Sequence, residues 1–73
     1  MNYIISIQQR KIKQWKPYLK RKHNELIVID KLDKFYGRKF YSTDEVFLDL
    51  YLTDEMLREF IARCAEAPII TEI

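Results

Sequence analysis

The chain has 73 residues, 48% of them hydrophobic, and a formal net charge of +2. A chain of this length predicts one domain, residues 1–73, which buries only about 60% of its surface on folding, so its core is thin. The single glycine, Gly37, excludes glycine-rich phosphate-binding loops, and the single cysteine, Cys64, excludes an internal disulfide and a cysteine-based zinc site.

No apolar run approaches the ~20 residues that a membrane span requires. Residues 1–7 also lack the basic lead that opens a signal peptide. We therefore expect a cytoplasmic protein that has no membrane partner.

The first predicted elements are a strand and a helix. Residues 3–7 are rich in β-branched side chains, and their imperfect alternation is typical of a strand covered on both faces. Residues 8–23 favour a helix, because three apolar side chains recur at helical spacing, namely Ile12, Trp15 and Leu19. Pro17 disturbs this helix, so we favour a helix over about 8–16 with a further turn that starts at Pro17, and a partly extended segment is the alternative.

The middle of the chain favours strands. Residues 26–29 form a continuous apolar run and predict a core strand. Residues 35–41 place two aromatic pairs around Gly37, which predicts a β-hairpin. Residues 46–52 alternate and predict a half-buried strand, although a capping-box pattern makes a helix over 43–52 the rival interpretation.

The last third predicts a helix and a strand. Thr53 can accept hydrogen bonds from the first turn of a helix, and Asp54 and Glu55 suit its positive end. Pro68 ends this helix, and residues 69–73 predict a short strand.

These elements predict an α+β fold with a small antiparallel sheet of three to four strands. One or two helices would lie on one face of that sheet. The ferredoxin-like order βαββαβ is one arrangement of the same pieces.

Catalytic chemistry has little support in the sequence, and we expect no enzyme, no cofactor and no metal site. His23 would need a positioned nucleophile to act as a base, so a polar surface residue is the simpler interpretation. Cys64 lies on the apolar face of the last helix, where a buried inert thiol is expected. The acids show no calcium-loop spacing, and Asp49 falls on the polar face of its predicted strand.

Positive charge supplies the main functional prediction. Seven of the thirteen Lys and Arg residues precede Glu25, and no acid does. Residues 25–73 contain the other six cations and all eleven acids. The early cations surround aromatic side chains, a mixture that suits contacts to phosphates and bases. They are Arg10, Lys11, Lys13, Lys16, Lys20, Arg21 and Lys22.

The predicted hairpin adds Arg38 and Lys39 to this surface if it lies on the same side of the fold. The sequence therefore predicts a small non-enzymatic regulator that docks on nucleic acid, or on a nucleic-acid-processing protein complex.

The alternative is a protein-binding inhibitor or accessory subunit. Its anchors would be aromatic side chains, since such residues dominate protein interfaces. The candidates are Trp15, Tyr18, Phe35, Tyr36 and Tyr41. The final strand would add to a partner's sheet if it lies at the sheet edge, and the thin core makes a homodimer one expected assembly.

Overall fold

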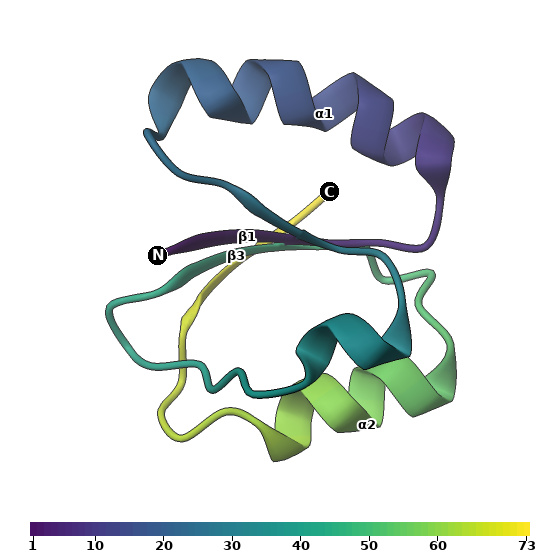
Figure 1. Cartoon of the computed structure of the whole chain (residues 1–73), viewed down its shortest axis with the longest axis vertical. Coiled ribbons are helices and arrows are strands. Elements are labelled where there is room, and N and C mark those ends of the chain that lie inside the picture. Colours follow the sequence, from purple (N-terminus) through teal and green to yellow (C-terminus); the bar gives the residue numbers. More distant parts are fainter.

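A computed structural model describes all residues, 1–73, and shows a four-stranded parallel sheet between two helical layers (Figure 1). The strands follow the order β2-β1-β3-β4, an order known from doubly wound sheets. They are β1 (Asn2–Ile5), β2 (Ile27–Ile29), β3 (Glu45–Leu48) and β4 (Ile69–Glu72). The helices are α1 (Gln9–Lys22), the short 3-10 helix η1 (Leu32–Phe35) and α2 (Asp54–Ala62).

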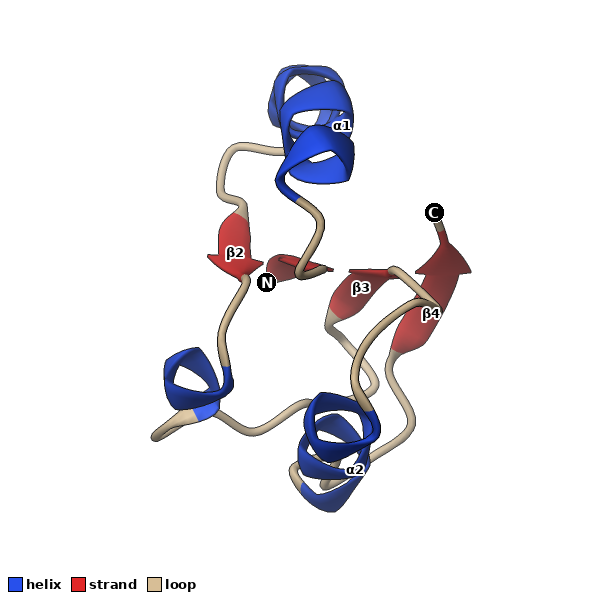
Figure 2. Cartoon of the chain, turned by 90° about the vertical axis from the view of Figure 1, so that its right-hand side faces the viewer, coloured by secondary structure: helices blue, strands red, loops and turns tan.

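Helices cover both faces of the sheet. The helix α1 lies on one face, where Leu19 packs on Ile4 and Phe47, while η1 and α2 lie on the other (Figure 2). The second face holds the larger cluster, which includes Phe35, Phe40 and Phe60 from outside the sheet. On the side of α1, no helix lies over β4 (Figure 2), and all four residues of this strand are exposed.

The predicted antiparallel sheet is wrong, because β1 pairs in parallel with β2 and β3, and β3 pairs in parallel with β4. Side chains on both faces of the central strands are buried, among them Ile4, Ile5 and Val46. Such burial requires cover on both faces, which is the usual setting of parallel strands. The ferredoxin-like arrangement and the placement of both helices on one face are therefore also wrong.

The predicted hairpin over 35–41 is wrong as well. Residues 32–35 form η1, and the chain then turns at Gly37, whose φ of +75° suits glycine. Phe35 and Phe40 do not pair across strands but pack edge-to-face inside the core, with ring centroids 6.3 Å apart. The spacing of the aromatic residues in this segment therefore reflects packing in the core and not cross-strand pairing in a hairpin.

The helix expected in this segment is confirmed as α1, but it continues through Pro17 as one helix instead of ending near residue 16 and restarting there. The start of α2 is confirmed too, since the Thr53 hydroxyl accepts from the Met56 amide at 3.2 Å. The strand predicted over 46–52 ends at Leu48, and the rival helix over 43–52 is absent. Neither helix has the length and hydrophobicity that crossing a membrane would demand.

Phe40 tests this core. Its ring is fully buried and contacts the rings of Tyr3 and Phe60 at centroid distances of 4.8 and 5.0 Å. We expect Phe40→Ala to lower the free energy of unfolding by about 3–5 kcal/mol, because it leaves a cavity in a thin core. Urea unfolding followed by circular dichroism measures the loss.

Tyr36→Ala is the matched control, since this aromatic side chain is 87% exposed. Its effect should stay within about 0.5 kcal/mol. Equal losses in the two variants would contradict the placement of Phe40 in the core.

Candidate functional site

The outer surface of α1 carries six exposed cationic side chains, which we call the basic face. They are Arg10, Lys13, Lys16, Lys20, Arg21 and Lys22. None of the six takes part in an ion pair, and α1 itself contains no acid. The basic face is thus an unneutralised surface of the folded chain.

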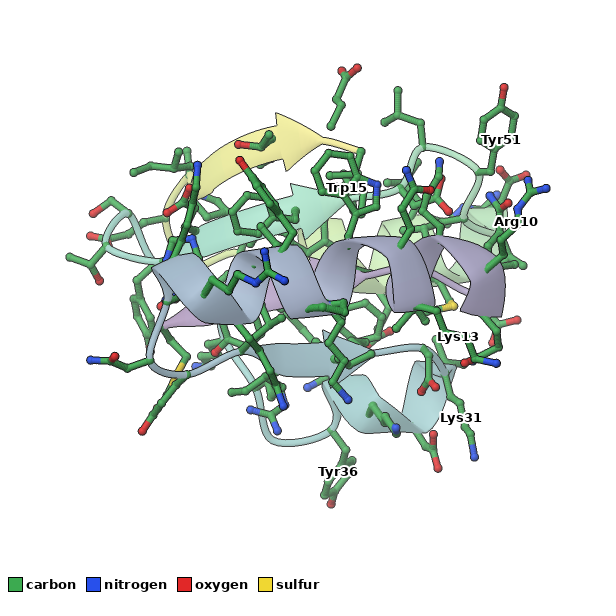
Figure 3. All side chains as sticks on the ribbon, turned by 90° about the horizontal axis from the view of Figure 1, so that it is seen from above. Arg10, Lys13, Trp15, Lys31, Tyr36 and Tyr51 are labelled. Atoms are coloured by element: carbon green, nitrogen blue, oxygen red, sulfur yellow. The ribbon has the colours of Figure 1, made fainter.

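The geometry of the helix explains this display. Ile12 and Leu19 are the buried residues of α1 and face the sheet. Lys13, Lys16 and Lys20 recur at intervals of three and four residues, so they share one flank. Trp15 leaves the helix on the opposite flank, toward β3 and β4 (Figure 3).

Lys11 is the exception among the early cations, because it is turned inward. Its ammonium lies 3.1 Å from a carboxylate oxygen of Asp49 and 3.0 Å from the carbonyl oxygen of Ile73. Asp49 is fully buried at the end of β3. Lys11 is therefore occupied in the fold, in contrast to the prediction that it joins the phosphate-binding surface.

Four donors saturate the Asp49 carboxylate, and we call this cluster the Asp49 brace. The Ser6 hydroxyl and the Gln8 side-chain amide donate to one oxygen of Asp49 at 2.8 and 2.9 Å. Lys11 and the backbone amide of Tyr51 donate to the other oxygen at 3.1 and 3.0 Å. The brace thereby joins the end of β1, the start of α1 and the end of β3.

The charge on Asp49 is stabilised by these contacts. Burial alone would raise its pKa, but the hydrogen bonds outweigh burial, that of the Tyr51 amide first and then those of Ser6 and Lys11, and hold the pKa of Asp49 below its ordinary value. An ionised carboxylate with all four lone-pair positions used has none free for a metal or a substrate. We conclude that the Asp49 brace positions α1 and performs no chemistry itself.

The sequence contains a signal for this brace, but the signal can be recognised only if the strands run parallel. Ser6 and Asp49 each follow a buried apolar run directly. In a parallel sheet these two positions lie at the carboxyl ends of neighbouring strands, where polar groups meet.

Beside Ser6 and Asp49, an open depression of about 480 Å³ is lined by Gln8, Arg10, Lys11 and Tyr51. Figure 3 shows Arg10 and Tyr51 at the same corner of the molecule.

Arg38 and Lys39 are not brought together with the basic face. They follow η1 on the opposite side of the sheet from α1, where Arg38 lies 6.0 Å from the ring centroid of Tyr3 (Figure 1). One flat polyanion therefore cannot contact them and α1 together.

The predicted aromatic anchors are also dispersed. Trp15 is half-buried and stacks edge-to-face on Tyr18, with ring centroids 5.9 Å apart. Tyr36 is 87% exposed and points away at another edge of the molecule (Figure 3). Tyr41 is exposed beside Arg38, and Phe35 is fully buried, so it is no anchor. Only Trp15 and Tyr18 form one surface.

The remaining reactive side chains lie apart from one another. His23 is half-buried at the end of α1, with its ring centroid 5.6 Å from that of Phe47. Burial raises the pKa of the Cys64 thiol, which donates to the carbonyl of Phe60 at 3.3 Å. No three side chains of the metal-binding types converge.

Comparison with protein-family models, with curated proteins and with solved structures finds no match to this chain. The functional argument therefore rests on its own residues.

Asp49→Asn tests the brace. In this variant an NH2 group replaces one charged oxygen of Asp49, so donors of the fold face another donor instead of an acceptor. We therefore expect the free energy of unfolding at neutral pH to fall by about 1–3 kcal/mol. Because the folded pKa is lowered, the contribution of Asp49 is present above about pH 4 and is lost as the pH falls through the folded pKa. The gap between wild type and variant should therefore narrow in acid.

Denaturant unfolding across this pH range measures the gap. The control is Asp33→Asn, an exposed acid without an ion pair, which should change stability by less than about 0.5 kcal/mol. A gap that stays constant from neutral to strongly acidic pH would show that Asp49 is not ionised in the brace.

Proposed function

We propose that the protein is a non-enzymatic nucleic-acid-binding regulator that contacts phosphates through the basic face of α1. The observation that carries this proposal is the set of six exposed cations on one helix with no ion-pair partner. Phosphate contacts of this kind release counterions and supply sequence-independent affinity.

The dimensions of α1 suit such a contact. Its 14 residues span about 21 Å, which is long enough to reach several successive phosphates along one strand. Arg10 and Arg21 lie near its two ends and turn away from the sheet, while Lys13, Lys16 and Lys20 occupy the flank between them. Lys22 lies on the other side of the helix, over the ring of Tyr18. No carboxylate on the helix competes with the polyanion.

The salt dependence of affinity tests this proposal. For a labelled 20-base-pair duplex, we expect log Kd to rise linearly with log salt, with a slope of about 0.9 per phosphate contacted. The double variant Lys13→Gln, Lys20→Gln should reduce this slope by about 1.8, because it removes two contacts from a helix that tolerates glutamine. Fluorescence anisotropy at several salt concentrations measures the slope.

Arg58→Gln is the control, since Arg58 is an exposed cation of α2 on the opposite side of the sheet. It should leave the slope unchanged. Binding that is absent at low salt, or an equal change of slope per charge in the control, would contradict the assignment to α1.

A second candidate function is protein binding at the uncovered strip beside α1. Thr71 is in register with Phe47, so Ile69, Thr71 and Ile73 face the side of the sheet on which α1 lies. Ile69 is 58% exposed there. Parallel strands normally carry helices on both faces, so the occupant that fits is an amphipathic helix of a partner protein.

Charge indicates the nature of that helix. Tyr18 stacks on Trp15, which leaves α1 toward β3 and β4, and the ammonium of Lys22 lies 4.7 Å from the centroid of the Tyr18 ring. A partner helix with an apolar stripe and acidic residues at its rim would complement this positive charge.

Copurification distinguishes this candidate from the first. We expect one stoichiometric protein that survives nuclease treatment, is lost with Ile69→Lys or Tyr18→Ala, and is retained with Tyr36→Ala. A partner that Ile69→Lys does not affect, or one that nuclease removes, would contradict docking on the strip.

A further inference from the structure

A second basic surface lies at the end of the sheet where the strands begin, on the face opposite α1. It is a depression of about 430 Å³, which we call the amino-edge depression. Its lining consists of Tyr3, Gly37, Arg38, Lys39, Tyr41 and Arg63. Three of these side chains are cationic and two are phenols, and none is a carboxylate.

The loop that carries this lining is held in place by α2. The amide of Phe40 donates to the carbonyl of Arg63 at 2.9 Å, and the amide of Ala65 donates to the carbonyl of Phe40 at 2.9 Å. The Arg63 guanidinium donates to the carbonyls of Phe35 and Arg38 at 2.6 and 3.3 Å. The depression is therefore organised before any ligand binds, which lowers the entropic cost of binding.

Its donors are mostly unused by the fold. The hydroxyl of Tyr3 lies in the lining of the depression, where it accepts from the Arg38 side chain and donates to no acceptor in the protein. Burial, and then the nearby Asp44 carboxylate, raise the pKa of Tyr3, so its phenol keeps the proton that it can donate. This hydroxyl is open to the depression, so its proton is available to an acceptor on a ligand.

The charges around the depression are unevenly compensated. The Asp44 carboxylate is occupied by the amide of Tyr41 at 2.8 Å and by the N-terminal amine at 3.2 Å. Arg63 pairs with Glu59. Arg38 donates from its Nε to the carbonyl of Lys34 at 3.2 Å and also hydrogen-bonds the Tyr3 hydroxyl, but neither Arg38 nor Lys39 has a carboxylate partner. The free donors thus converge with two uncompensated positive charges.

We propose that the amino-edge depression binds the phosphate group of a phosphorylated small molecule, a phosphate monoester. A phosphate offers three acceptor oxygens and nearly two negative charges at neutral pH, which matches a lining with three cations, two hydroxyls and no carboxylate. A smaller hollow of about 220 Å³ shares the three cations and adds Ala62, Cys64 and Ala65. Its apolar walls accommodate the organic part of the ester.

Titration of the ¹⁵N-labelled protein with phenyl phosphate at low ionic strength tests this site. We expect the amide signals of residues 37–39 and 63–65 to shift. Arg38→Gln and Lys39→Gln should each weaken binding about ten-fold, because each removes a charge-assisted hydrogen bond. Tyr3→Phe should weaken it several-fold with little change in stability, since the hydroxyl donates to nothing in the fold and accepts only from the partly exposed Arg38 side chain. Tyr36→Phe is the control and should bind like wild type.

Two comparisons identify the ligand and separate this site from α1. Inorganic phosphate should bind more weakly than phenyl phosphate, and equal or tighter binding would overturn the assignment to an ester. The double variant Lys13→Gln, Lys20→Gln should bind phenyl phosphate like wild type, and its failure to bind would place the phosphate on α1. No shift with either compound, or shifts that Tyr3→Phe and Lys39→Gln leave unchanged, would overturn the site altogether.

Discussion

The carboxylate of Asp49 is the constraint on which the rest of the surface depends. It is buried at the end of β3, and it can stay ionised there only because four donors from three segments converge on it. One of those donors is Lys11, so the carboxylate fixes how α1 is rotated about its own axis. With Lys11 turned inward and Ile12 and Leu19 on the sheet, the other cations of the helix have to point outward.

This rotation separates two kinds of positive charge. Lys11 neutralises a buried acid and belongs to the framework, whereas the cations of the basic face are exposed and have no carboxylate partner. On the other side of the sheet, Arg63 likewise belongs to the framework through Glu59 and the carbonyl of Phe35, while Arg38 and Lys39 remain uncompensated. The small net charge of +2 thus conceals two basic surfaces on opposite sides of one sheet.

Local chemistry made several elements predictable from the sequence. Thr53 marks the start of α2, because a capping hydroxyl hydrogen-bonds an amide within the first turn of the helix. The spacing of Ile12 and Leu19 likewise indicates α1, although Pro17 lies between them. Strand direction was not predictable in this way, because it depends on which faces are covered. The alternation that extended the third strand to residue 52 was a coincidence, since Leu50 is exposed in a turn and Leu52 packs on the core from the loop before α2.

The candidate site was predictable only in part, for the same reason. An acid-free segment implies outward charge, and the structure brings six of its seven cations to the surface of α1. The seventh, Lys11, is paired with an acid 38 residues away, and only the parallel order of the strands brings the two together. Arg38 and Lys39 were grouped with α1 because a hairpin was expected, and the crossover through η1 places them on the other face.

Mapping the backbone amides that respond to nucleic acid tests the central claim most directly. The measurement is a ¹H–¹⁵N correlation spectrum recorded during addition of a short duplex without terminal phosphates. The account predicts that the signals of residues 10–22 shift and that those of residues 37–39 and 63–65 do not. Shifts confined to α2 and the loop after η1, with α1 unaffected, would contradict it.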